Sequence, residues 1–193
     1  SMVFQKFALF PHKTILHNVG YGLSIQGISK DIWIEKATKW INRVGLDGYE
    51  DYYPGQLSGG MQQRVGLARA LATDAEILLM DEAFSALDPL IRSEMQNILL
   101  DLQNELHKTI IFITHDLDEA LKIGDRIAIL RDGGMIQDSD PQNIIMNPKD
   151  DYVSDFIKDI NRARVIQAKS IMTPTNKKST GPIISENMVL EDI

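Results

Sequence analysis

The chain has 193 residues, of which 44% are hydrophobic and 24% are charged. This balance is typical of a globular domain and excludes a chain that is disordered throughout. With 20 basic against 27 acidic residues the formal net charge is -7, which argues against sequence-independent binding to DNA. Because the chain has no cysteine, disulfides, thiolate catalysis and cysteine-bound zinc are excluded. No apolar run reaches the roughly 20 residues that a membrane-spanning helix needs.

The first part of the chain predicts the end of a strand, at residues 2–4, followed by helices. Thr14 can cap a short helix that extends to Gly20. Asp31 begins a second helix, which Gly45 ends, and a third helix is predicted over residues 60–72.

The second part alternates strands with helices. Residues 76–80 and 109–114 form apolar runs, which suit strands buried on both faces of a parallel sheet. A long helix from Pro89 to residue 107 separates them. Further predicted elements are a helix over residues 116–123, a hairpin around residues 132–134, and short helices over residues 143–146 and 152–160. The alternation predicts an α/β fold with a parallel-sheet core.

Polar side chains follow both predicted strands directly. Asp81 and Glu82 end the first strand, and His115 ends the second. Ligands bind at the carboxyl ends of strands in open α/β sheets, where a carboxylate can hold Mg²⁺ with nucleotide phosphates and a second one can polarise a water molecule. The alternative for Asp81 is a turn cap, for Glu82 a solvated side chain, and for His115 a capping or structural histidine.

A serine and two glycines precede the third predicted helix. Ser58, Gly59 and Gly60 would place a hydroxyl and unobstructed backbone at the amino end of that helix, where an anion is stabilised. The alternative is an ordinary serine cap with a tight turn. The longer string Leu-Ser-Gly-Gly-Met-Gln-Gln-Arg, residues 57–64, is far more specific than its Ser-Gly-Gly centre.

These strings together resemble the nucleotide-binding subunit of an ABC transporter, a P-loop NTPase-like α/β fold with a helical subdomain. The resemblance covers residues 2–161 and rests on several motifs in one order. It implies that Glu82, His115 and Gln5 are catalytic, with Gln5 as the Q-loop glutamine, and that Asp81 and Gln5 bind Mg²⁺. It also implies nucleotide contacts for Ser58, Gly59, Gly60, Gln62 and Asp88. Those of the serine–glycine string would be made to the nucleotide held by the opposite protomer. Met61 stands where many members of the family have glutamine.

The P-loop sequence GxxxxGK[ST] occurs nowhere in the chain. The family carries it upstream of the Q-loop, so the resemblance implies an N-terminally truncated piece of a longer subunit, inactive by itself. Residues 1–160 are expected to be a partial ATPase domain, with a helical subdomain over about 12–72 and a core over 73–160. A linker is expected over residues 161–182, and residues 183–193 resemble the start of a CBS module.

Within the family, weaker motifs such as residues 116–120 and 151–156 are similar to glycine betaine/proline-type importers. The implied function is ATP hydrolysis that drives import of a compatible solute. The implied partners are a membrane permease, a second copy of the subunit and, indirectly, a solute-binding protein, at the cytoplasmic face of the membrane and without nucleic acid. The alternatives are a non-transport ABC ATPase and a regulatory module that senses a nucleotide or ionic strength. The alternative for the tail is an unstructured linker.

Overall fold

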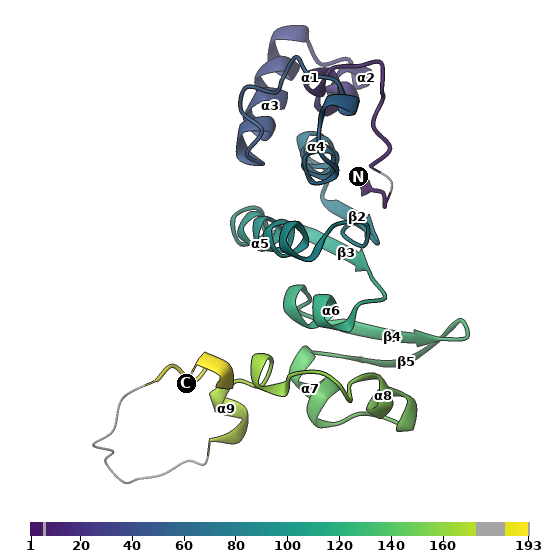
Figure 1. Cartoon of the computed structure of the whole chain (residues 1–193), viewed down its shortest axis with the longest axis vertical. Helices are drawn as coiled ribbons and strands as arrows, with labels where there is room; N and C mark the ends of the chain where they lie inside the picture. Colours follow the sequence, from purple (N-terminus) through teal and green to yellow (C-terminus); the bar gives the residue numbers. More distant parts are fainter. Residues whose placement is uncertain (6, 173–183, 193) are drawn as a thin grey trace. The chain divides into compact units, whose positions relative to one another are not determined.

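The computed structural model describes residues 1–5, 7–172 and 184–192 (Figure 1). The chain divides into two compact units, Ser1–His115 and Asp116–Ile193, and each has a hydrophobic core of its own. Residues 173–182 of the predicted linker lie outside the described residues, as do both ends of the predicted CBS start, residues 183 and 193.

The first unit contains a group of four helices, α1 to α4. Thr14 caps α1 as predicted, since its side chain accepts a hydrogen bond from the backbone of His17. The sequence prediction missed α2, whose N-cap residue is Gly20 and which therefore has no side-chain cap. The bounds are α1 Ile15–Val19, α2 Tyr21–Ile25, α3 Lys30–Arg43 and α4 Gly59–Ala72. Their shared core includes Ile15, Val19, Ala37, Ile41, Val44, Leu46, Val65 and Ala68.

A parallel sheet completes the first unit, in the order β1–β2–β3. Val3 pairs with Met80, and Met80 pairs with Phe112, so the amino-terminal strand is an edge of this sheet. The predicted parallel α/β core is therefore confirmed. The bounds are β1 Met2–Val3, β2 Ile77–Asp81 and β3 Thr109–Ile113, with helix α5 at Pro89–Leu106 between the last two strands.

Burial alternates along β2, so the prediction that both faces of this strand are buried is wrong within the first unit. Leu78 and Met80 are buried, whereas Ile77 is 49% exposed and Leu79 is 40% exposed. The physical reason is the two-residue period of a strand, which turns successive side chains to opposite faces. Described residues of this unit cover only one of these faces.

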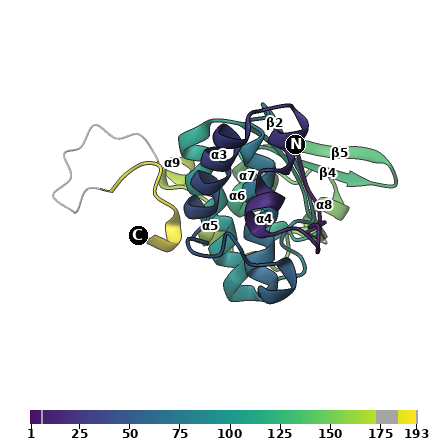
Figure 2. The same cartoon turned by 90° about the horizontal axis from the view of Figure 1, so that it is seen from above.

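The second unit is built around an antiparallel hairpin, which Figure 2 shows with its two strands side by side. The helix predicted from residue 116 is present, with Asp116 as its cap, and the predicted hairpin turns at residues 132–133, since Gly134 begins the second strand. The bounds are α6 Leu117–Ile123, β4 Ile127–Arg131, β5 Gly134–Ser139, α7 Pro141–Met146 and α8 Asp151–Phe156. The core is formed by Leu117, Leu121, Ile127, Ile129, Ile144, Ile145, Val153 and Ile157.

The end of the chain folds back on the segment before the undescribed residues. Ala168 donates its backbone N–H to Met188 at 2.8 Å, and Leu190 donates to Ile166 at 3.0 Å. The Arg164 guanidinium also pairs with Glu191 at 2.9 Å. The short elements here are η2 Arg162–Arg164, α9 Ala168–Ile171 and η3 Leu190–Asp192. Residues 184–192 thus pair with residues on both sides of the start of α9.

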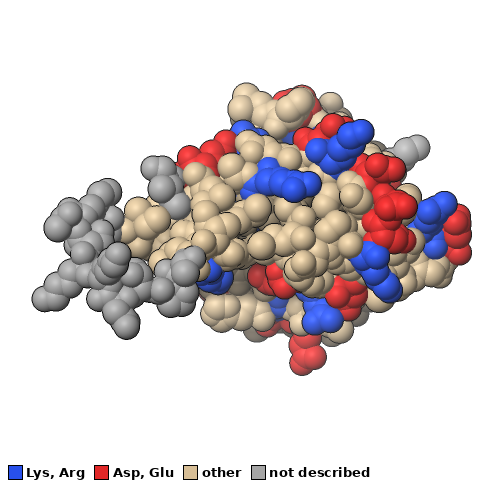
Figure 3. Space-filling model, turned by 90° about the horizontal axis from the view of Figure 1, so that it is seen from below, with Lys and Arg blue, Asp and Glu red and all other residues tan. Residues whose placement is uncertain are grey.

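Charges of both signs are mixed on the surface. On the face drawn in Figure 3, basic and acidic side chains of the described residues lie beside one another. Among the helices of the described residues, none is both long and apolar enough to span a membrane.

Candidate functional site

The candidate site lies in the first unit, at the carboxyl ends of its three parallel strands. Gln5 follows β1, Glu82 follows β2 and His115 follows β3. Parallel strands end at the same edge of a sheet, so these residues, far apart in sequence, reach one place. The structure therefore brings together three of the residues that the sequence nominated.

Glu82 is the centre of this cluster. Its Oε2 accepts a hydrogen bond from the Gln5 amide nitrogen at 3.0 Å. Its Oε1 lies 3.2 Å from Nδ1 of His115, an ion pair when the imidazole is protonated. The Glu82 side chain is 34% exposed and that of His115 is 72% exposed, so both groups remain accessible to a ligand from solvent.

The backbone at Glu82 adopts an unusual conformation. Its φ of 44° lies in the left-handed region, which is strained for a residue other than glycine. Its N–H donates to the carbonyl of Ile113 at 2.9 Å, which joins the end of β2 to the end of β3. Because of this backbone conformation, the Glu82 side chain does not continue the alternating pattern of β2, and it contacts Gln5 and His115 instead.

Ser85 is a further member of the cluster, which was not nominated from the sequence as a site residue. Its Oγ accepts a hydrogen bond from Gln5 at 3.1 Å and donates one to the carbonyl of Glu82 at 2.9 Å. Ser85 therefore bridges Gln5 and the backbone that carries the candidate catalytic carboxylate. Ser85 comes three residues after Glu82. In the sequence this spacing is the signal that a turn can bring the Ser85 side chain close to the end of the strand.

Asp81 is the last residue of β2 and pairs with Ile113 in the sheet register. Carboxylate and amide oxygens from Asp81, Glu82 and Gln5 are the ligand types that Mg²⁺ prefers, so the donor set at this edge fits that ion. In the described ranges, however, no group of three histidine or acidic residues is arranged to enclose a metal by itself.

The serine–glycine string forms the start of α4, as predicted. Ser58 Oγ accepts a hydrogen bond from the N–H of Met61 at 3.3 Å, and Gln62 donates to the carbonyl of Leu57 at 3.2 Å. Gly60 packs against α5, where a Cβ atom would lie 2.5 Å from the methyl Cγ2 of Ile91. A Cβ on Gly59 would meet no atom within 4 Å, so this backbone is open to an approaching ligand.

Asp88 caps the next helix, since its Oδ1 accepts a hydrogen bond from the N–H of Ile91 at 3.1 Å. Gly60 and Asp88 therefore flank the same residue, Ile91. The nominated residues thus fall into two groups on different elements. Gln5, Asp81, Glu82 and His115 stand at the sheet edge, whereas Ser58, Gly59, Gly60 and Gln62 stand at the start of α4, next to the start of α5.

Comparison with known proteins finds a family model and several relatives to which this chain is similar. Residues 1–85 match the model of the family described as "ABC transporter". The chain is 61% identical over 172 residues to the glycine betaine transport ATP-binding protein OpuAA of Bacillus subtilis, covering 89% of this chain and 41% of that protein.

Two further relatives show the same pattern. Identity is 60% to the glycine betaine/carnitine transport ATP-binding protein GbuA of Listeria monocytogenes, over 89% of this chain and 43% of that protein. It is 53% to the glycine betaine/proline betaine transport system ATP-binding protein ProV of Escherichia coli, over 91% of this chain and 44% of that protein. The chain therefore spans less than half the length of these three relatives.

Proposed function

We propose that the chain belongs to the ABC transporter family and that it is part of a longer subunit that hydrolyses ATP to drive import of a compatible solute of the glycine betaine/proline type. The single observation that carries this proposal is the convergence of Gln5, Glu82 and His115 at the carboxyl edge of the sheet. The names of the relatives supply the solute class, since each is an ATP-binding protein of betaine transport.

The chemistry assigned to the sheet edge is phosphoryl transfer from ATP to water. Glu82 would orient the attacking water, and its contacts to Gln5 and His115 fix the carboxylate in one position. His115 would donate a hydrogen bond to a phosphate oxygen. Asp81 and Gln5 would hold Mg²⁺, which offsets negative charge on the phosphates when bound.

The residues at the start of α4 are assigned to the nucleotide of a second copy. Ser58, Gly59, Gly60 and Gln62 would present backbone N–H groups and the amino end of a helix to the terminal phosphate. Asp88 would contact the nucleotide from the neighbouring helix start. The open space at Gly59 supports close approach of a phosphate to the backbone.

The proposed partners follow from this assignment: a second copy of the subunit, an integral membrane permease, and a solute-binding protein acting through the permease. The subunit itself would lie at the cytoplasmic face of the membrane. We assign residues 1–160 to a partial ATPase domain, with the helical subdomain at about 12–72 and the core at 73–160. Residues 161–182 would be a linker and residues 183–193 the start of a CBS module.

The first experiment substitutes Glu82→Gln in the full-length protein that contains this chain. ATP hydrolysis should fall by at least about a hundredfold while Mg-ATP binding persists, because the amide cannot polarise water. An unchanged rate of hydrolysis would refute the assignment of Glu82.

The isolated chain makes a separate prediction. Because it lacks the P-loop sequence, Mg-ATP should bind it only weakly, and it should not hydrolyse ATP at a substantial rate. Isothermal titration is the measurement, and low-micromolar binding of Mg-ATP to the isolated chain would contradict this part of the proposal.

One observation keeps the regulatory alternative in view. Residues 184–192 make backbone hydrogen bonds and an ion pair with residues 164–169, which supports a folded element at this end rather than an unstructured tail. If this element senses ionic strength, Glu191→Gln in the full-length protein, which removes the ion pair with Arg164, should change how ATP hydrolysis depends on salt concentration. The rate at one reference salt concentration should stay the same. A non-transport ATPase has no such support here, and co-purification with a membrane permease would exclude it.

A further inference from the structure

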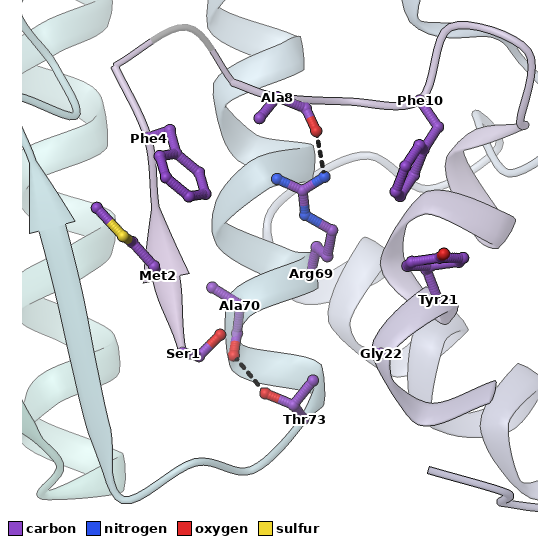
Figure 4. Close-up of a pocket in the computed structure, with 10 residues that line it drawn as sticks. All are labelled: Ser1, Met2, Phe4, Ala8, Phe10, Tyr21, Gly22, Arg69, Ala70 and Thr73. Atoms are coloured by element: carbon purple, nitrogen blue, oxygen red, sulfur yellow. Dashed lines mark hydrogen bonds between the residues drawn. The ribbon is translucent and has the colours of Figure 1, made fainter. Parts of the chain in front are cut away.

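Arg69 of α4 holds the turn that follows Gln5. Its Nη1 donates to the carbonyl of Ala8 at 2.6 Å, and its Nη2 donates to the carbonyl of Phe7 at 2.8 Å. Figure 4 shows the guanidinium reaching from α4 to the segment that carries Ala8. A planar guanidinium that binds two successive carbonyls fixes their direction as well as their distance.

The turn that Arg69 holds is strained. Phe7 has a φ of 47° and Ala8 a φ of 46°, so two successive residues other than glycine adopt the left-handed conformation. Each such residue costs on the order of 1 kcal/mol or more, and it persists only where the surroundings hold it in place. A charged donor on both carbonyls is a contact that can do so.

The far end of the segment is held separately. The Asn18 side chain, fully buried, accepts a hydrogen bond from the N–H of Phe10 at 2.8 Å and donates to the carbonyl of Phe10 at 3.1 Å. Asn18 thus anchors Phe10 to α1, whereas Arg69 anchors Phe7 and Ala8 to α4. Loss of Arg69 would release the part of the segment that is nearer to Gln5.

Open space lies beside Arg69. A cavity of about 350 Å³ is lined by the Arg69 side chain together with Phe4, Phe10 and Tyr21 (Figure 4). Burial lowers the pKa of the Arg69 guanidinium, yet an arginine remains charged at physiological pH. A side chain shorter than arginine at position 69 would not reach both carbonyls, and the cavity would leave this side of the turn open to solvent.

Gln5 is separated from Phe7 by one residue, and adjacent Cα atoms are about 3.8 Å apart. The position of Phe7 therefore restricts where the Gln5 amide can be placed. On its other side Gln5 is bound to Glu82 and Ser85. We infer that Arg69 is a positioning residue, which ties α4 to the Phe7–Ala8 turn and thereby holds the Gln5 amide against the Glu82 carboxylate.

The effect of Arg69 on ATP hydrolysis rests on the proposed function, whereas its effect on the position of the Phe7–Ala8 turn does not. Since Ser58 caps the start of α4, the same helix carries the serine–glycine string at one end and the contact to the Gln5 segment near the other. A displacement of α4 relative to the sheet would therefore change the position of Gln5 through Arg69.

The catalytic test is a double-mutant cycle in the full-length protein. Arg69→Lys keeps the charge but loses the paired donors, so kcat for ATP hydrolysis should fall about tenfold with a change in KM of less than about twofold. In the background of Gln5→Ala, the same substitution should change kcat by less than about twofold, because its effect passes through Gln5. Additive losses, or a loss confined to KM, would overturn the inference. The matched control is Arg43→Lys, an arginine of α3 paired with Glu105, which should leave kcat unchanged.

The structural test is amide hydrogen exchange of the same proteins without nucleotide. In Arg69→Lys the N–H of Phe7, which donates to the carbonyl of Phe4 at 3.2 Å, should exchange about tenfold faster, whereas Arg43→Lys should not alter it. Adding Ala8→Gly, which relieves the left-handed backbone, should restore part of the protection in Arg69→Lys. An unchanged exchange rate at the Phe7 N–H in Arg69→Lys would refute the inference that Arg69 holds the Phe7–Ala8 turn. Faster exchange in a protein whose wild type does not hydrolyse ATP would retain the tie and refute only the proposed function.

Discussion

The helices and the sheet of the first unit differ in how completely they bury their apolar residues. The helices α1 to α4 enclose Ile15, Val19 and Ile41, each with no exposed surface. On the sheet, Ile111 is 52% exposed and Ile113 is 57% exposed. The helical group therefore completes its own core, whereas one face of the sheet is left without cover from the described residues of its unit.

The candidate catalytic cluster belongs to the less covered of these regions. Gln5, Glu82 and His115 all follow strands, and the contacts that hold them are hydrogen bonds and an ion pair rather than apolar packing. The comparison suggests that stability of the first unit comes mainly from the helices, whereas chemistry depends on the exposed edge of the sheet. Four substitutions test this division, in order of decreasing expected effect.

Ile41→Ala should produce the largest change. It removes a fully buried side chain from the helical core, so the free energy of unfolding should fall by about 2–5 kcal/mol. The control is Ile32→Ala on the same helix, where the side chain is 49% exposed and the expected loss is below about 1 kcal/mol. Denaturant titration of both variants is the measurement, and equal losses would show that α3 does not pack as described.

Asn18→Leu should come next. The buried Asn18 amide donates to the carbonyls of Phe10, Lys13 and Thr14 and accepts from the N–H of Phe10. An isosteric apolar side chain removes the hydrogen-bond partner of the Phe10 N–H and of the Lys13 carbonyl, whereas the carbonyls of Phe10 and Thr14 keep a backbone donor, so the free energy of unfolding should fall by about 2–3 kcal/mol. Chemical denaturation measures the loss, and a change below about 0.5 kcal/mol would mean that water replaces the amide.

Asp74→Asn should have a smaller effect that depends on pH. The hydrogen bond from the Lys108 ammonium, followed by its charge, lowers the pKa of the Asp74 carboxyl below its usual value. The ammonium also donates to the carbonyl of Ala75 at 2.9 Å, which joins the turn before β2 to the turn before β3. The Asp74 side chain is 81% exposed, so solvent screening limits the expected loss to about 0.5 kcal/mol at neutral pH.

The sign of the pH dependence follows from the lowered pKa. In the unfolded chain the Asp74 carboxyl has a pKa of about 3.9, and in the folded chain its pKa is lower. As the pH falls, the unfolded chain therefore binds a proton at Asp74 before the folded chain does. The stability that Asp74 contributes is present above about pH 3.9 and is lost as the pH falls through the folded pKa. The difference between wild type and Asp74→Asn should therefore vanish in acid. Asparagine tolerates the left-handed φ of 55° at this position, so the substitution tests charge rather than backbone strain. A difference that persists in acid would contradict the electrostatic explanation.

Ile113→Thr should produce the smallest change, below about 0.5 kcal/mol in the chain studied, because threonine keeps the β-branched shape and the residue is mostly exposed. Thermal or denaturant unfolding measures it. A loss of several kcal/mol would show that this face of the sheet is covered in solution, and the contrast between the helices and the sheet would then disappear.

Several local features were predictable because they depend on neighbours in sequence. Thr14 and Asp116 cap their helices, and the Asp-Gly turn at residues 132–133 joins two strands. The polar residues after the strands were recognisable for a topological reason, since the ends of parallel strands share an edge. Helix α2 was not recognisable, because its start has no capping side chain and its glycine, Gly22, packs closely against Thr73 of a distant segment.

Patterns among near neighbours in the sequence predicted most of the strands and helices, several caps and turns, and the residues that stand at the strand ends. The packing of distant segments establishes that Ser85 bridges Gln5 and Glu82, that Arg69 holds the Phe7–Ala8 turn, and that one face of β2 is exposed. The physical reason is distance along the chain. Arg69 and Ala8 are 61 positions apart, and Gln5 and Ser85 are 80 positions apart, so no local pattern can encode a contact that exists only after the sheet and the helices have packed.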